Sequence, residues 1–458
     1  MEPTAFPADP ALPQLAIASH PGLMLEVFRT HLRPLTRDTY HIQDCQVSRI
    51  RYRRGTRCIL QYTLRLMESK TGREWSLWVT GIIDAEGRAE RAWERLRTVD
   101  LAPEVPEAFR TFEPICFIAT LGMLVQIFPY DRRLPGLCRL MARPSPDLEP
   151  LLLSGLGSGN WRVERWDIEP IRYRSQLGAV LRYSLHARDT ITGRQAGKRF
   201  YVKIYRDEEG ERTYRVLQAL WEKAEAGEDG FTVGRPMAYL ESLHALVQEE
   251  APGASLQQIL LQGTDIATVV RKIAWTLAMF NQQDLALLRH HSRTNEISDL
   301  QRAGMLLQWV CPHLKAEVDV IVSTVTKYLD DVPPGPTHRD LKPDHLLLDG
   351  DRLSLLDLDW FTGADPVLDP AALLATISSM PFCCSVPRDR VWMAARAFAE
   401  EYFNHVPKAW RRRLSLHYAG AVLKQAVGFF RRQEQGWPGT VAALVEAARQ
   451  SLAGGIWR

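Results

Sequence analysis

Asp340 and Asp357 stand in the stretch HRDLKPDHLLLDGDRLSLLDLDW, residues 338–360, on either side of two apolar runs. The runs flank an Asp-Gly turn, which is a strong hairpin signal. A hairpin would bring Asp340, just before it, near Asp357, at the end of its second strand. Two close carboxylates repel each other unless they share a cation or take part in acid–base chemistry. A divalent metal such as Mg²⁺, held by carboxylates, water and phosphates, would relieve that repulsion.

The elements around this stretch fall into two kinds. From about residue 256 onward, six segments carry apolar residues at three- and four-residue spacing and predict helices. Before that point, IRYR, VLRYSLHA and RFYVKIYR alternate apolar and polar residues and predict antiparallel strands. A helix follows in GERTYRVLQALWEKAEA, and a second set of strands ends at the Pro-Gly of LVQEEAPG. The pattern predicts a small β-rich lobe followed by a larger helical lobe.

The β-rich lobe has an earlier copy in the chain. Five apolar and aromatic residues return 121 residues later in the same order: Ile50, Tyr52, Leu60, Tyr62 and Leu64 as Ile171, Tyr173, Leu181, Tyr183 and Leu185. The turn Thr-Gly-Arg also returns, and VTGIIDAEGRAER matches VKIYRDEEGERTY, which aligns Thr80 with Lys203. This spacing is far longer than a solenoid repeat, so we interpret it as a domain duplication.

The bulk composition excludes several classes of protein. A length of 458 residues predicts two or three domains, and 46% hydrophobic with 24% charged residues is typical of globular chains. The net charge of +3 gives no indication of nucleic-acid binding. The first residues lack the pattern of a secretory signal, and no apolar run reaches the roughly 18 residues of a membrane helix. Seven scattered cysteines without a C-x-x-C pattern indicate a cytoplasmic protein with reduced thiols.

Two motifs in the helical region resemble a known family. HRDLKPDH is similar to the catalytic loop of the protein-kinase-like fold, with Asp340 at the catalytic-base position and Asp357 at the metal position. The following DPVLDPA, with Asp365 and Asp369, resembles the GDP-x-x-DLA element of the aminoglycoside phosphotransferase family. No A-P-E motif or long activation segment follows Asp357, which favours a small-molecule kinase over a protein kinase.

The resemblance implies an α+β, two-lobed kinase-like fold preceded by a second α+β domain. We predict a degenerate first domain at 1–141, a linker at 142–160, a small lobe ending in a hinge at 161–255, and a helical lobe at 256–458. The first domain is then a cap, a substrate-recognition element or a module that binds a protein partner.

For the small lobe, the resemblance implies a set of nucleotide contacts. Lys203 would reach the phosphates of ATP, and Glu211 would be its ion-pair partner, with Glu208 and Glu209 as competitors. Glu249 and Ala251, in the hinge, would offer backbone groups to adenine. Asp340 would accept the proton of a hydroxyl on a sugar, amino sugar or amino alcohol, with neither nucleic acid nor membrane as a partner.

The chain departs from the family pattern at three positions. His345 stands where the family usually has Asn, and we predict that it holds the metal with Asp357. Imidazole suits Mn²⁺ better than Mg²⁺, so we predict Mg²⁺ and keep Mn²⁺ as an alternative metal. Arg339 replaces a usual Gly, and the expected phosphate loop offers only Gly178. These departures leave open a pseudokinase that binds nucleotide or acts as a scaffold without turnover, and HRDLKP keeps a protein kinase as a third alternative.

Overall fold

The computed structural model describes residues 6–35, 40–142, 144, 148–227, 230–263, 265–285 and 289–454. The first five residues of the chain and four residues of the predicted linker, 143 and 145–147, lie outside these ranges. The chain divides into two compact units. Unit 1 comprises Met1–Tyr214, Pro236–Glu250 and Arg431–Gln433; unit 2 comprises Arg215–Arg235, Ala251–Phe430 and Glu434–Arg458. We describe each unit by itself.

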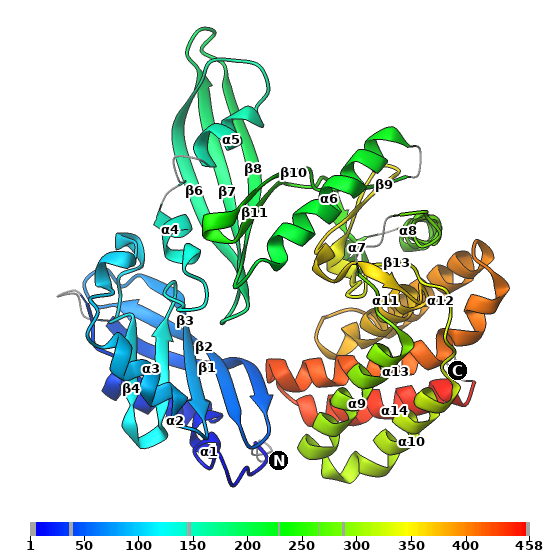
Figure 1. Cartoon of the computed structure of the whole chain (residues 1–458), viewed down its shortest axis with the longest axis horizontal. Coiled ribbons are helices and arrows are strands. Elements are labelled where there is room, and N and C mark those ends of the chain that lie inside the picture. The colour runs from blue at the N-terminus through cyan, green and yellow to red at the C-terminus, as the bar shows by residue number, and fades with distance from the viewer. Residues whose placement is uncertain are drawn as a thin grey trace. The chain divides into compact units, whose positions relative to one another are not determined.

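Unit 1 contains two antiparallel five-stranded sheets with the same strand order (Figure 1). The first is built from β1 (Tyr40–Arg53), β2 (Arg57–Glu68), β3 (Glu74–Asp84), β5 (Met123–Ile127) and β4 (Ile115–Ile118), in that order. The second is built from β6 (Trp161–Arg174), β7 (Gly178–Asp189), β8 (Gln195–Tyr205), β11 (Ala245–Glu249) and β10 (Pro236–Leu240). The first three strands of the second sheet each begin 121 residues after their counterparts.

Two helices precede each sheet and one helix follows its third strand. The first set is α1 (Leu15–Ala18), α2 (Pro21–His31) and α3 (Arg88–Leu96), and the second set is α4 (Gly136–Ala142), α5 (Leu148–Ser154) and α6 (Glu209–Ala226, divided between the units). Tyr62 donates a hydrogen bond to the carbonyl of Ala18, and its counterpart Tyr183 donates to that of Leu140. The helices α1 and α4 are therefore held to their sheets in the same way in the two copies.

The duplication begins with a short motif that precedes the helices. FPADPALP at 6–13 returns as FPYDRRLP at 128–135. Asp9 accepts hydrogen bonds from the Tyr52 hydroxyl at 2.5 Å and from the Gly55 N–H at 2.8 Å. Asp131 accepts the equivalent bonds from Tyr173 and Gln176, so each aspartate holds the first hairpin turn of its own copy. We call residues 6–127 the first repeat and 128–249 the second repeat.

The predicted linker at 142–160 differs in the structure. It contains α5, whose Leu148 and Leu152 are buried in the core of the second sheet. That core also includes Phe128 and Leu134, whereas Leu12 and Phe28 belong to the core of the first sheet. Pro, Gly and Ser are frequent in linkers, but here apolar leucines between them pack onto a sheet. We therefore propose a boundary near Phe128 instead of a linker.

The equivalence of Thr80 with Lys203 is also wrong. Lys203 pairs with Val180 on β7 and with Leu246 on β11. The counterparts of these two residues in the first sheet are Ile59 and Leu124, and both pair with Ile82. Ile82 lies in an apolar cluster with Ile59, Leu124, Ala89 and Ala92 of α3. The first repeat therefore has an apolar side chain packed under a helix at the position of the lysine.

Unit 2 is mainly helical, as the spacing of apolar residues predicts, and the predicted α+β fold class is confirmed by these helices and the antiparallel sheets (Figure 1). Its helices of seven residues or more are α7 (Leu256–Gln262), α8 (Ile266–Phe280), α9 (Arg293–Val310), α10 (Lys315–Tyr328), α11 (Leu368–Ser379), α12 (Arg388–Asn404), α13 (Lys408–Arg432, divided between the units) and α14 (Trp437–Leu452). Among the described residues, none of the helices has the length and apolarity required to span a membrane.

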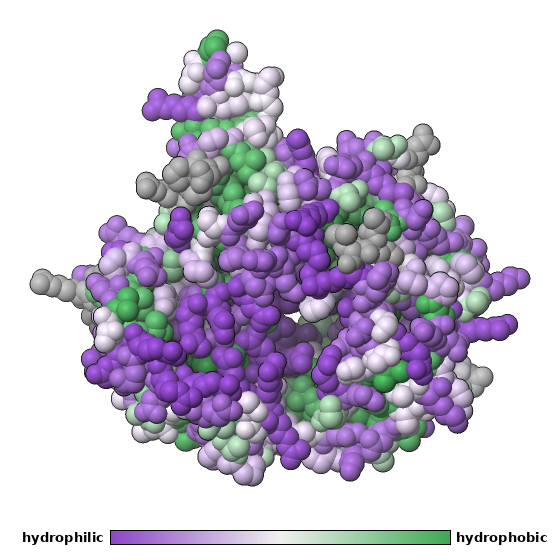
Figure 2. Space-filling view, viewed as in Figure 1, coloured by the Kyte–Doolittle hydropathy of each residue, from purple (hydrophilic) through white to green (hydrophobic). Residues whose placement is uncertain are grey.

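Six short strands stand among these helices. They are β9 (Phe231–Val233), β12 (Ala254–Ser255), β13 (Gly335–Thr337), β14 (Leu346–Asp349), β15 (Arg352–Leu355) and β16 (Thr362–Ala364). A four-stranded sheet has the order β12-β14-β15-β9, and β13 pairs with β16. On the face shown in Figure 2, hydrophilic side chains cover most of the surface and apolar residues form only small patches.

Candidate active site

The predicted hairpin positions the two aspartates. β14 pairs with β15 from Leu346↔Leu355 to Asp349↔Arg352, and Gly350 takes a φ of 58° in the turn between them. Asp340 lies in the loop that leads from β13 to this hairpin, and Asp357 follows β15 directly. The hairpin therefore returns the chain to the same end of the sheet, as the Asp-Gly turn predicts.

At that end the structure brings Asp340, His345 and Asp357 together. One ligand atom from each of the three lies within 4.8 Å of the other two. The carboxylates are partly exposed, with side-chain exposures of 30% for Asp340 and 18% for Asp357, whereas His345 is buried at 5%. Solvent and a ligand can therefore reach the two carboxylates, whereas the His345 side chain is covered by protein.

The hydrogen bonds of His345 assign its tautomer. Nδ1 lies 2.8 Å from the main-chain carbonyl of Asp340, which can only accept, so Nδ1 carries the proton. Nε2 then presents a lone pair and lies 3.6 Å from Oδ2 of Asp357. Burial lowers the pKa of His345, and the neighbouring His338 lowers it further, which favours the neutral ring. A lone pair facing a carboxylate oxygen without a proton between them is an arrangement that a cation would stabilise.

A second histidine supports the first. His338 stacks on His345 with ring centroids 5.6 Å apart. Its Nε2 donates to the carbonyl of Leu356 at 2.7 Å, and its Nδ1 accepts from the N–H of Asp340 at 3.3 Å. The stack fixes the plane of the His345 ring, and such support is typical of a metal-binding imidazole. The Asp357 carboxylate and the imidazole nitrogen of His345 are fitting ligands for Mn²⁺ or Mg²⁺, and Asp340 lies beside them.

Asp369 holds the loop that carries Asp340. It is fully buried and accepts hydrogen bonds from the N–H groups of His338 and Arg339, each at 2.8 Å, and from the Asn281 amide at 3.0 Å. Burial raises the pKa of Asp369, and the three donors oppose this by stabilising the carboxylate. Tyr402 in turn donates to Asn281 at 2.9 Å. Sequence reasoning missed Asn281 and Tyr402, because no local pattern distinguishes them from other helix-end and core residues.

Arg339 takes the left-handed backbone conformation, with a φ of 66°. This explains why Gly would suit the position, since only Gly adopts such a φ without strain. The Arg339 guanidinium lies 3.2 Å from a carboxylate oxygen of Asp299 and 5.7 Å from the ring centre of Trp360. These contacts stabilise the side chain next to Asp340. Lys342 approaches from the other side, with Nζ 2.7 Å from Oδ2 of Asp340.

The predicted nucleotide contacts lie on the elements expected for them. Lys203 is on β8, with Nζ 5.5 Å from the ring centre of Tyr205, and Glu211 is in the first turn of α6. Glu249 ends β11 and forms an ion pair with Lys198 at 2.7 Å, and Ala251 follows as a buried residue. Lys203, Glu211 and Glu249 belong to unit 1, whereas Ala251 and the aspartate group belong to unit 2. The roles of these four residues stay predictions.

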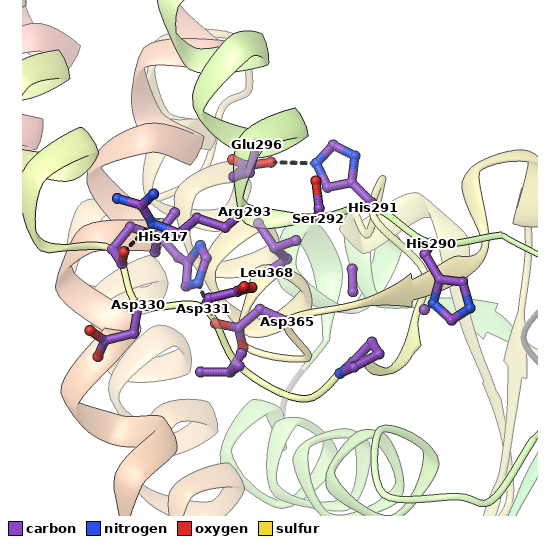
Figure 3. Close-up of a pocket in the computed structure, with 15 residues that line it drawn as sticks. His290, His291, Ser292, Arg293, Glu296, Asp330, Asp331, Asp365, Leu368 and His417 are labelled. Carbon is purple, nitrogen blue, oxygen red and sulfur yellow. Dashed lines mark hydrogen bonds and ion pairs between the residues drawn. The ribbon is translucent and has the colours of Figure 1, made fainter.

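A cavity of about 270 Å³ lies in unit 2 near β16 (Figure 3). Asp365, of the DPVLDPA motif, lines it and accepts hydrogen bonds from Arg413 at 2.7 and 2.9 Å and from His417 at 2.8 Å. Glu296, also in the wall, binds His291 at 3.0 Å and Lys424 at 2.5 Å. The buried carboxylates of this cavity are thus paired with cations. Asp340, His345 and Asp357 do not line it.

Residues 188–413 match the model of the phosphotransferase enzyme family. The match includes the whole stretch from β13 to β16. Among curated protein sequences, none matches the chain significantly.

Solved structures similar to the chain include kinases of small molecules. A thermostable mutant of an aminoglycoside phosphotransferase in its apo form is 15% identical, covers 67% of this chain and 99% of its own, and has a TM-score of 0.46. An ethanolamine kinase of Plasmodium vivax is 12% identical, with coverages of 70% and 95% and a TM-score of 0.41. A GDP and kanamycin complex of another aminoglycoside phosphotransferase is 11% identical, with coverages of 64% and 95% and a TM-score of 0.42.

Proposed function

We propose that this chain is a kinase that transfers the γ-phosphoryl group of ATP to a hydroxyl of a small molecule, such as a sugar, an amino sugar or an amino alcohol. The observation that carries the proposal is the convergence of Asp340, His345 and Asp357 within the segment that matches the phosphotransferase enzyme family. A pseudokinase would keep the fold without needing three potential metal ligands at one end of the hairpin.

In this proposal each residue has one task. Asp340 orients the acceptor hydroxyl and accepts its proton as the hydroxyl oxygen forms a bond to the γ-phosphorus and ADP leaves. Asp357 and His345 would hold a divalent ion, which neutralises phosphate charge when bound. Lys203 binds the phosphates with Glu211 as its partner, and the main chain at Glu249 and Ala251 binds the base. Lys342, 2.7 Å from Asp340, is placed to stabilise the ionised carboxylate.

The experiment that tests the proposal is phosphoryl transfer from radiolabelled ATP to a panel of amino sugars, sugars and amino alcohols, with Mg²⁺ and with Mn²⁺. We expect a labelled product from wild type. General-base catalysis contributes about 10²- to 10⁴-fold, so Asp340→Asn should lower kcat by that order and leave ATP affinity nearly unchanged. ATP binding without transfer to any acceptor would favour the pseudokinase. Labelling of casein or histone instead would favour a protein kinase.

A further inference from the structure

The turn between β6 and β7, residues 174–178, is the counterpart of the glycine-rich loop that covers the phosphates in kinases. It is tied to the first repeat. Gln61 donates to the carbonyl of Tyr173 at 3.1 Å and accepts from the N–H of Ser175 at 3.4 Å. Arg57 donates to the side-chain oxygen of Gln176 at 2.8 Å. Ser175 and Gln176 are only 6% and 3% exposed, so these two residues are covered by protein, whereas Leu177 beside them is exposed.

The donors of this turn are already used. Asp131 accepts from the N–H of Gln176 at 2.7 Å, while the N–H of Ser175 donates to Gln61. Gln176 has a φ of 58°, and its side chain lies 3.4 Å from that of Gln126. A glycine-rich loop offers its amides to phosphate oxygens, but these two amides have protein partners. The phosphates must therefore find other donors.

Several arginines lie around the turn whose amides already have hydrogen-bond partners. Arg57 contacts Gln176, Arg132 follows Asp131, and Arg174 opens the turn. Nε of Arg132 and Nε of Arg174 are buried and have no acceptor in the part of the chain that the structure describes. Buried donors without an acceptor are costly, and an anion is one way to satisfy them. Burial lowers the pKa of Arg57, and Arg132 lowers it further by repulsion.

The carboxylates close to these arginines have other partners. Asp131 binds the Tyr173 hydroxyl at 2.9 Å and the N–H of Arg133 at 2.9 Å, besides Gln176. Asp84 accepts from the N–H groups of Glu86, Arg88 and Ala89, at the start of α3. Arg57, Arg132 and Arg174 outnumber these two carboxylates, whose hydrogen bonds go to main-chain amides and a hydroxyl. An anionic ligand would restore the balance.

We propose that Arg57, hydrogen-bonded to Gln176 of the turn, and Arg132, which follows the aspartate that holds the turn, bind a phosphate group of the nucleotide in place of the turn's own amides. The inference rests on the proposed function, because the phosphate belongs to the nucleotide that the second sheet would bind. The turn leads directly into that site: Gly178 pairs with Tyr205 and Val180 with Lys203. The first repeat then contributes to nucleotide binding through Arg57, although its own lysine position holds Ile82.

The test is calorimetric titration of ATP and of adenosine into wild type, Arg57→Ala and Arg65→Ala. Arg65 is a matched control, because it lies on the same strand, β2, and is exposed. Loss of a charged hydrogen bond should weaken ATP binding to Arg57→Ala by about 10- to 100-fold and leave adenosine binding unchanged. Arg65→Ala should bind both as wild type does. Arg57→Lys, which keeps the charge, should recover part of the ATP affinity.

Several outcomes would overturn the inference. Equal ATP affinity in wild type and Arg57→Ala would show that Arg57 does not contact phosphate, and an equal loss for adenosine would show a general distortion. Arg132→Ala serves as a second variant if Arg57→Ala melts below the assay temperature, and unchanged ATP affinity there would count equally against it. Pyrophosphate that binds together with ATP, without competition, would place the anion outside the nucleotide site. Failure of wild type to bind ATP would overturn the proposed function as well.

Discussion

Nε2 of His345 lies 3.6 Å from Oδ2 of Asp357, and the proton of the ring is on Nδ1, where it binds the carbonyl of Asp340. The imidazole therefore presents a nitrogen ligand beside a carboxylate ligand. Nitrogen ligands suit Mn²⁺ better than Mg²⁺. We expect Mn²⁺ to support tighter ATP binding than Mg²⁺ in wild type, and His345→Asn to shift the preference toward Mg²⁺. Calorimetry with each metal measures this, and an identical Mn²⁺-to-Mg²⁺ ratio in both proteins would contradict it.

The two repeats should differ in nucleotide binding. Because Ile82 and its apolar cluster stand where the second repeat has Lys203, we expect one nucleotide per chain. Lys203→Met should weaken ATP binding by about 10- to 100-fold through the lost charged contact. Ile82→Val, a small change in the first repeat, should leave ATP affinity unchanged. A measured stoichiometry of two would show that the first repeat also binds nucleotide.

Asp369 should matter for stability more than an exposed aspartate does. Asp369→Ala removes an acceptor that three donors share, in a fully buried site. Leaving such donors without a partner costs about 1–3 kcal/mol each, so we expect a loss of at least about 2 kcal/mol in the free energy of unfolding. Urea unfolding measures it. Asp351→Ala is the control, because Asp351 is largely exposed and pairs with Lys272 at the surface. A similar loss in both variants would argue against a special role for Asp369.

Asp365 should make stability depend on pH in the acid range. Burial opposes its ionisation, but the bonds from His417 and Arg413 outweigh burial and hold the pKa of Asp365 well below its ordinary value. Because the pKa is depressed in the folded state, the stabilisation is fully present above the unfolded pKa of about 3.9 and is lost as the pH falls through the folded pKa.

We therefore expect Asp365→Asn to be less stable than wild type at pH 7, with the difference shrinking below about pH 4. Thermal melts at a series of pH values measure it. Asp299→Asn is a useful comparison, since Asp299 also pairs with arginines but has a side chain 29% exposed. A difference between wild type and Asp365→Asn that stays constant from pH 7 to pH 3 would contradict the assignment.

The local geometry of the hairpin could be predicted from the sequence. The Asp-Gly turn and its two apolar runs fix the return of the chain over a short distance, and Asp340, His345 and Asp357 therefore meet as expected. The support of this group could not be predicted in the same way. Asn281 reaches Asp369 from the end of α8 and Tyr402 reaches Asn281 from α12, so only the packing of unit 2 brings them together.

The duplication could be predicted only in part. The strands carry enough aromatic and apolar residues to reveal the repeat, but the alignment of Thr80 with Lys203 is two residues away from the observed register. A slip of two residues keeps every side chain on the same face of a strand, so the alternating pattern cannot detect it. The repeated FPxDxxLP motif is short and distant from the strands. Its meaning becomes clear only when Asp9 and Asp131 are seen to bind the hairpin turns.

The hydrogen bonds between the turn 174–178 and the first repeat also affect which truncated forms of the chain can keep this turn in place. A truncation that began at Phe128 would keep Asp131 but remove Gln61 and Arg57. The amide of Ser175 and the side chain of Gln176, now covered, would then face solvent or an open apolar surface. We therefore expect the second repeat to depend on the first for the shape of this turn. A fragment lacking the first repeat would lose the surface that holds residues 174–178.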